Sequence, residues 1–200
     1  IPWVVEALGQ KNWAFAADAV RLYALYTEGG IYLDSDVEIV KPIDELLGRQ
    51  YILGYENGSK RIEPSFLGAE PGNPIIAEAL KHYAERHYEY NEEMVEMMVL
   101  PQILTEACDK FSELEIFPEW YFSPKKFLDG SISTSDETFS IHHFGSNWRP
   151  ENVRNGINTR IQIFKRFPRP IAEVLAFPYT VWTNLRTLGP IVAIKRLISK

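Results

Sequence analysis

The amino-acid sequence predicts an α/β fold, because helical and strand patterns alternate along most of its 200 residues. Three apolar runs of strand length, at residues 31–33, 51–56 and 65–70, are separated by turn residues and by stretches with helical spacing. Apolar residues form 46% of the chain, which is ample for a packed core. Length and composition therefore indicate one α/β domain with a tail.

Residues 13–28 are predicted to form the first helix. Asn12 is a suitable N-cap, and apolar residues recur through the segment at helical spacing, giving one broad buried face. The pair Gly29-Gly30 ends this helix, since glycine readily adopts the left-handed conformation found after many helices. Two short strands, at residues 31–33 and 37–40, are expected to follow.

The other elements are predicted from the same two periods and from the positions of proline and glycine. His82 and His87 lie five residues apart on a charged helix, which misses the i, i+4 spacing of a helical metal site, and we expect both to be solvated. The predicted elements are a short helix at 43–47, strands at 51–56 and 65–70, a helix at 75–89, a helical stretch at 92–111 broken by Pro101, short strands at 115–117 and 121–122, a turn at 129–130 and a strand at 139–144.

Charge divides the chain into two parts. Residues 1–150 carry 25 acidic and 12 basic residues, whereas residues 151–200 carry 2 and 9. We therefore expect a folded core at 1–150 and a basic helical extension at 151–200, broken at residues 168–170, 178 and 189–190. The acidic core argues against nucleic acid as a partner.

Three further features bound the protein's class. Cys108 is the one cysteine of the sequence, so an intrachain disulfide is excluded. No apolar run reaches the roughly 18 residues that a membrane-spanning helix needs. The sequence starts at Ile1 rather than at methionine, and we expect an N-terminal part of the protein, including one strand of the fold, to lie ahead of it.

Asp34 and Asp36 are the strongest candidates for a functional site. They end the predicted strand at 31–33, where two carboxylates one residue apart repel each other unless a positive group lies between them. Oxygen ligands suit Mg²⁺ or Mn²⁺, and an added imidazole favours Mn²⁺. The pattern also fits a polar strand end without a ligand.

Two other kinds of site also contain an Asp-x-Asp sequence. An EF-hand loop starting at Asp34 is excluded, because its sixth position is Ile39 instead of glycine and Pro42 lies inside it. A phosphatase of the haloacid dehalogenase type also has a strand ending in Asp-x-Asp. Such an enzyme needs a later pair of adjacent acidic residues, and no Asp-Asp occurs in this sequence. It stays open as an alternative enzyme.

Two more groups of residues carry chemistry. Asp18 and Arg21 share a helix face among small apolar residues, which favours a cleft position suited to sugar hydroxyls and phosphates. His142 and His143 end a predicted strand. Adjacent strand residues point to opposite faces, so only one of these histidines can reach a given metal ion.

Five segments together resemble the glycosyltransferases that have a DXD sugar-binding region, which form family 32. This family includes capsular and surface polysaccharide transferases and fungal α-mannosyltransferases, and the chain is similar as well to the catalytic core of the large clostridial glucosylating toxins. The segments are AFAADAVRLYALYTEGGIYLDSDVEIVKPID at 14–44, FLGAEPGNPII at 66–76, LPQILTEA at 100–107, IFPEWYFSP at 116–124 and IHHFGSNW at 141–148.

The resemblance implies a GT-A fold with a Rossmann-like mixed sheet, a nucleotide-sugar donor, a divalent metal ion and retention of anomeric configuration. It implies that Asp18 and Arg21 hold the donor sugar. Asp34 is expected to contact the ribose or sugar and to share in metal binding, and Asp36 to ligate the metal directly. The position of Trp148 favours His143 as third ligand, with His142 as the alternative. Ser146, Asn147 and Trp148 are implied at the diphosphate, although Asn147 interrupts the usual Ser-Trp pair.

The expected protein is thus a retaining hexosyltransferase of surface or capsular polysaccharide synthesis, with a saccharide or lipid-linked acceptor. A catalytically inactive sugar- or nucleotide-binding module is the second alternative. Aromatic and basic residues alternate in residues 160–200, a mixture that suits an anionic membrane surface. We expect a cytoplasmic protein, peripheral on the inner face of the membrane if this extension binds lipid.

Overall fold

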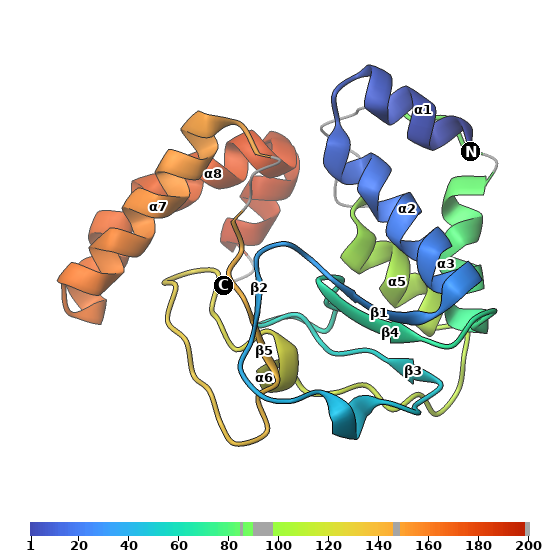
Figure 1. The fold of residues 1–200 in the computed structure, drawn as a ribbon. Helices are drawn as coiled ribbons and strands as arrows, with labels where there is room; N and C mark the ends of the chain where they lie inside the picture. The colour runs from blue at the N-terminus through green and yellow to red at the C-terminus, as the bar shows by residue number, and fades with distance from the viewer. Residues whose placement is uncertain (85, 90–97, 146–148, 199–200) are drawn as a thin grey trace. The chain divides into compact units, whose positions relative to one another are not determined.

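The computed structural model describes residues 1–84, 86–89, 98–145 and 149–198 (Figure 1). These residues form helices and small sheets, so the predicted α/β class is confirmed. They divide into two compact units, which we describe separately. The first contains the described residues up to 125 together with 132–144, and the second contains 126–131, 145 and 149–198.

The first unit begins with a helix that the sequence pattern had not indicated, α1 (Pro2–Gly9). The proline lies in its first turn, where a missing backbone N–H costs nothing. Trp3 is buried, and its indole N–H donates to the carbonyl of Phe15 at 3.1 Å. This contact fixes α1 against α2 (Trp13–Glu28), which has the predicted bounds.

Gly29 ends α2 as expected, with φ at 69°. A Cβ at this position would lie 2.5 Å from the Pro71 ring, so both backbone conformation and packing require glycine. The chain then turns directly into β1 (Gly30–Leu33). The turn is what places the end of β1 beside the middle of α2.

Two antiparallel sheets follow. The first has the order β1-β4-β3, with β4 (Phe66–Ala69) fully buried in the centre and β3 (Tyr51–Ile52) on its other side. The second pairs β2 (Val37–Ile39) with β5 (Ser140–His142). Parallel pairing occurs, among the described residues, as one isolated bridge between Gly54 and Phe117. The strand predicted at 115–117 is therefore reduced to this bridge. A 3-10 turn at Asp44–Leu46 lies in the predicted short helix.

Helices α2, α3 (Pro74–Ala84) and α5 (Leu100–Cys108) lie on one face of the first sheet (Figure 1). The main core lies between these helices and the sheet, with residues such as Leu22, Leu67 and Leu104 fully buried. The helical stretch is interrupted next to Pro101, as predicted: residue 98 is helical, Val99 is extended, and α5 then starts with Pro101 in its first turn, where proline is tolerated.

The strand predicted at 121–122 is wrong. The segment forms the short helix α6 (Glu119–Phe122). Adjacent strand residues point to opposite faces, but the rings of Tyr121 and Phe122 both lie near Phe139, at 5.9 and 6.0 Å between centroids. A helical turn allows both rings to reach the same partner.

The second unit consists mainly of α7 (Glu151–Arg166) and α8 (Arg169–Ile198). The predicted break at Pro168 is confirmed, but α8 continues through Pro178 and Gly189. Pro178 has no backbone N–H to donate to the carbonyl of Val174. Because Val174 is 72% exposed, water can donate to that carbonyl instead. In the described part of the chain, no helix is both long and apolar enough to span a bilayer.

Candidate functional site

The turn that carries Asp34 and Asp36 connects the two sheets of the first unit. The backbone N–H of Asp34 donates to Ser65 at the start of β4, at 2.9 Å, and the N–H of Val37 donates to the Asp34 carbonyl at 3.1 Å. On the other side, the N–H of His143 donates to the Asp36 carbonyl at 3.0 Å. Both carboxylates are therefore held on backbone fixed by strands.

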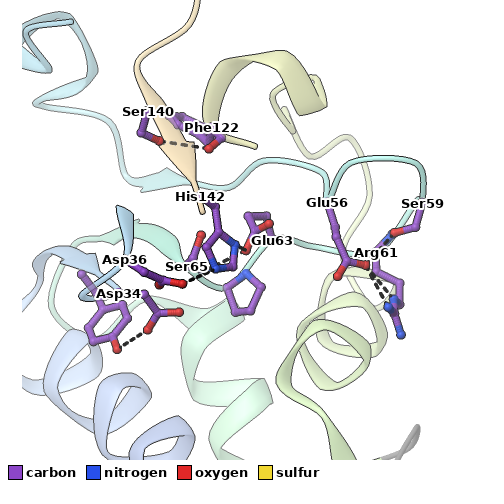
Figure 2. A network of polar contacts seen from close by, with 12 residues as sticks. Asp34, Asp36, Glu56, Ser59, Arg61, Glu63, Ser65, Phe122, Ser140 and His142 are labelled. Atoms are coloured by element: carbon purple, nitrogen blue, oxygen red, sulfur yellow. Dashed lines mark hydrogen bonds and ion pairs between the residues drawn. The ribbon is translucent and has the colours of Figure 1, made fainter. Parts of the chain in front are cut away.

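His142 joins these two carboxylates (Figure 2). One ligand atom from each of Asp34, Asp36 and His142 lies within 4.8 Å of the others. His142 is opposite Val37 in the β2–β5 register, which brings its Nε2 to 3.6 Å from Asp36 Oδ2. His143 points elsewhere, with Nε2 at 2.8 Å from Glu38 Oε2. The sequence analysis favoured His143 as the third ligand and gave His142 as the alternative. In the structure, His142 is the histidine that belongs to the cluster.

Arg21 connects Asp18 to Asp34. Its guanidinium contacts Asp18 at 3.1 Å and Asp34 at 3.2 Å, and it donates to the carbonyl of Pro64 at 3.1 Å. It also lies over the Tyr32 ring, 4.5 Å from the centroid. Helix α2 therefore presents a charged pair directly beside the DXD turn, as the sequence predicted.

Burial controls the charge states of this pair. Burial raises the pKa of Asp18 to about 6; the charge of Arg21 opposes this shift and that of Asp34 adds to it. Burial lowers the pKa of Arg21, but Asp18 and Asp34 outweigh it, so the pKa rises above its ordinary value. The guanidinium is consequently a fixed cation that contacts both Asp18 and Asp34.

Tyr32 is a site residue that our sequence analysis missed. Its hydroxyl donates to Asp34 Oδ1 at 2.7 Å. Tyr32 lies two residues before Asp34, so the two-residue period of a strand places both side chains on one face and could have identified it. Asp34 is thereby held from two sides, by Tyr32 and Arg21.

Glu63 is the second residue that was missed. It is buried, 1% exposed, and its Oε1 lies 3.2 Å from His142 Nδ1 (Figure 2). Burial disfavours protonated His142, but hydrogen bonding to Asp36 and Glu63 outweighs this and raises its pKa to about 10. No periodic pattern marks Glu63, since it lies in an irregular segment before Pro64.

The remaining sequence predictions concern residues 146–148 and His82. Ser146, Asn147 and Trp148 are outside the described residues. The expectation that His82 is solvated is wrong. Its ring is partly buried in edge contacts with Trp3 and Tyr83, and burial lowers its pKa to about 4. Its place on α3, opposite α1, explains this difference, because α1 was not foreseen.

The cluster has the donor set of a divalent-cation site. Two carboxylates and one imidazole offer mainly oxygen ligands with a single nitrogen, which suits Mn²⁺ or Mg²⁺. The Nε2 atom of His142 faces Asp36, while Nδ1 faces Glu63. The residues present therefore fit a metal ion bound through Asp36 and His142, with Asp34 beside them.

Comparison with known proteins bears directly on this region. Residues 1–53 match the family model described as "Glycosyltransferase sugar-binding region containing DXD motif". The match includes Asp18, Arg21, Asp34 and Asp36. The front of the chain is related to the DXD glycosyltransferases. The resemblance that the sequence motifs indicated is thus confirmed.

Two curated relatives are glycosyltransferases as well. The human alpha-1,4-N-acetylglucosaminyltransferase is 24% identical over 211 residues, which cover 93% of this chain and 59% of the human protein. The inositol phosphoceramide mannosyltransferase 1 of Schizosaccharomyces pombe is 31% identical over 80 residues, which cover 36% of this chain and 23% of the yeast protein. The alignments thus span less than two thirds of either relative.

A solved structure of the PaToxG glycosyltransferase is similar over 54% of this chain and 38% of its own. The TM-score is 0.40 and the sequence identity 23%.

Proposed function

We propose that this protein is a metal-dependent, retaining glycosyltransferase of the GT-A type, which transfers a hexose from a nucleoside-diphosphate sugar to a saccharide or lipid-linked acceptor. The observation that carries the proposal is the contact between two groups. The Asp34–Asp36–His142 cluster adjoins the Asp18–Arg21 pair, and all of these residues except His142 lie in the region, residues 1–53, that matches the DXD family model.

The contacts support a distinct role for each residue. Asp36 and His142 face each other and are the proposed direct ligands of Mn²⁺ or Mg²⁺. Asp34 already accepts a hydrogen bond from Tyr32 and an ion pair from Arg21, so its orientation is set before any ligand arrives. It is the proposed partner of the ribose or sugar, close enough to share in metal binding.

Arg21 and Asp18 are the proposed sugar-binding pair. A carboxylate and a guanidinium together offer acceptors and donors for hydroxyl groups, and the guanidinium can also donate to phosphate. When bound, the divalent cation supplies Lewis-acid stabilisation of the diphosphate leaving group. Ser146, Asn147 and Trp148 are proposed to bind the same diphosphate.

The donor sugar is proposed only as a hexose, since the names of the two relatives specify N-acetylglucosamine in one case and mannose in the other. A role in surface or capsular polysaccharide synthesis is a further part of the proposal. It rests on the sequence resemblance described above.

The exposed corner between α7 and α8 is proposed to bind an anionic membrane surface. Residues 165–171, KRFPRPI, are all exposed, with three basic residues around Phe167. Ile171 and Val174 are 51% and 72% exposed and lie three residues apart, so they continue the apolar surface along one side of α8. Basic residues beside an apolar strip favour the interface of an anionic bilayer. The proposed location is the inner face of the cytoplasmic membrane.

The metal-site assignment is tested with Asp36→Ala in the full-length protein. Donor hydrolysis is measured with Mn²⁺ over a panel of nucleoside-diphosphate hexoses. We expect a loss of about 100-fold or more, because a ligand of the ion that neutralises the leaving group is removed. Glu38→Ala is the matched control, since this nearby carboxylate contacts His143 instead of the cluster. Equal hydrolysis by both variants would refute the assignment.

The inactive-module alternative is tested on the wild-type protein. Calorimetry detects binding of a nucleoside diphosphate in the presence of Mn²⁺, and the hydrolysis assay detects turnover. Binding without hydrolysis or transfer of any donor would identify the module and contradict the enzyme.

A further inference from the structure

Glu63 is a buried carboxylate next to the site, and no step proposed above uses it. Its position is fixed by the backbone on both sides: its N–H donates to Gly54 at 2.8 Å, and its Oε1 accepts from the N–H of Ser65 at 3.0 Å. These bonds tie it to the segment that leads into β4. The side chain therefore has little freedom to move away from His142.

A carboxylate that is 1% exposed needs compensation for its lost hydration. Among the described residues, neither Glu63 Oε2 nor His142 Nδ1 makes a hydrogen bond. Glu63 Oε1 accepts from Ser65 N–H and lies at ion-pair distance, 3.2 Å, from His142 Nδ1. His142 is thus its charged or polarised counterpart. A buried carboxylate with so few partners lowers the stability of the fold. A role in the site, acting through His142, would account for its presence.

The His142 ring is confined on more than one side. Its Nδ1 lies 3.2 Å from Glu63, and its ring centroid lies 4.1 Å from that of Phe144. The remaining nitrogen, Nε2, faces Asp36 at 3.6 Å. Figure 2 shows Glu63 and Asp36 on either side of the imidazole. One ring nitrogen therefore faces a buried carboxylate, and the other faces the cluster.

We propose that Glu63 is a positioning residue for the metal site: it holds a proton on His142 Nδ1 and so aims Nε2 at the ion that Asp36 binds. Metal-ligating histidines commonly donate their second N–H to a carboxylate, which fixes tautomer and orientation and makes the imidazole a stronger ligand. The inference rests on the proposed metal site and adds a residue to it from a segment 27 positions further along the chain.

A purely structural role makes different predictions. If Glu63 only neutralised a buried imidazolium, its replacement would change stability but leave metal binding by the folded protein unaltered. If Glu63 positions His142, metal affinity falls even where the variant remains folded. Metal binding by folded protein therefore separates the two roles.

The main experiment compares Glu63→Gln with wild type. Binding of Mn²⁺ alone is followed by the loss of the free-ion signal in electron paramagnetic resonance, and folding by circular dichroism. We expect binding to weaken by about 10- to 100-fold, the usual effect of removing such a partner. All proteins are compared at equal pH, from about pH 6 to about pH 8, because the ion displaces a proton from its ligands.

Glu56→Gln is the matched control. Glu56 lies close to Glu63 in sequence and pairs with Arg61 at 2.9 Å, remote from the cluster contacts (Figure 2). Its replacement removes a carboxylate of the same kind and should leave Mn²⁺ binding unchanged. Equal affinity of the Glu63→Gln and Glu56→Gln variants would overturn the proposal.

A measurement on wild type covers the case in which Glu63→Gln does not fold. Nitrogen NMR of His142 with diamagnetic Mg²⁺ should show a proton on Nδ1 and none on Nε2. The opposite tautomer would overturn the proposal. If wild type binds Mn²⁺ and Asp36→Ala does not, but Glu63→Gln binds normally, only the Glu63 inference fails. If wild type binds no Mn²⁺, the proposed function fails with it.

Discussion

Arg21 Nη1 lies 3.2 Å from Asp34 Oδ1, so a single ion pair joins the middle of helix α2 to the end of strand β1. The same guanidinium contacts Asp18 and the Pro64 carbonyl. The arginine is 8% exposed, so its removal would leave partly buried carboxylates without their cation, which is costly. Arg21 is consequently both part of the proposed sugar site and a structural link of the first unit.

Arg21→Ala should therefore reduce both activity and stability. Two partly buried carboxylates lose their cation, and breaking such a pair costs about 3 kcal/mol of unfolding free energy. Donor hydrolysis should fall by about 100-fold or more. Urea unfolding and the hydrolysis assay measure the two effects. Arg49→Ala is the control, because its pair with Glu115 is exposed and worth about 1 kcal/mol or less. Equal effects of both changes would contradict the linking role.

Tyr32→Phe should lower both activity and stability. The change removes the hydroxyl that donates to Asp34 at 2.7 Å but keeps the ring beneath Arg21. One lost hydrogen bond to a charged group costs about 1.5 to 3 kcal/mol, and the freed carboxylate should lower hydrolysis by about tenfold. Thermal unfolding and steady-state kinetics check this. Unchanged kinetics would show that Asp34 needs no orientation by Tyr32.

His82 should make the protein less stable in acid. Its pKa falls from 6.5 to about 4, mainly through burial; Arg86 lowers it further and Glu106 opposes the shift. The unfolded chain then binds more protons than the folded one between these values. The contribution of His82 is thus fully present above pH 6.5 and is lost as the pH falls towards about 4.

His82→Phe, which keeps an aromatic ring against Trp3, should therefore flatten the decline of unfolding free energy below pH 6.5. His87→Gln is a control of opposite sign. Hydrogen bonding to Glu6 raises the pKa of His87, so its contribution is present at low pH and lost as pH rises. Urea titrations at about pH 7 and about pH 5 measure the differences. An unchanged pH slope in His82→Phe would contradict the burial effect.

The sequence was sufficient where partners lie close together along the chain. Asp18, Arg21, Asp34 and Asp36 fall on one helix and the next strand end, so spacing and the glycine turn bring them together. The choice of His142 depends on the β2–β5 register, which pairs residues more than one hundred positions apart. Local patterns do not encode such a register, and a shift by one residue exchanges the two faces.

The misassigned elements have similar causes. Tyr121 and Phe122 have the composition of a strand, and only their shared packing against Phe139 favours a helical turn. Pro178 is a helix breaker by intrinsic propensity, but its position on an exposed side of α8 lets water satisfy the freed carbonyl. Tertiary contact and solvent access decided these cases, and neither is visible in a single sequence.

The proposed membrane surface predicts that charge at the α7–α8 corner controls lipid binding. The double change Arg166→Ala and Arg169→Ala removes two exposed basic residues beside Phe167. Each contributes about 1 kcal/mol at an anionic surface, so binding should weaken by about 20- to 30-fold. Flotation of the full-length protein with vesicles of anionic lipid measures the effect, and vesicles of neutral lipid should float little of any variant.

A control variant with the same change of net charge distinguishes binding through this surface from nonspecific attraction of the whole protein to anionic lipid. Lys11→Ala with Lys60→Ala removes the same net charge from exposed positions of the first unit. That variant should float like wild type, because the proposed surface consists of the basic and apolar residues of the α7–α8 corner and does not include these lysines. Equal losses in both double variants would mean that net charge alone governs binding. Failure of the wild type to float with anionic vesicles would remove the membrane from the proposal.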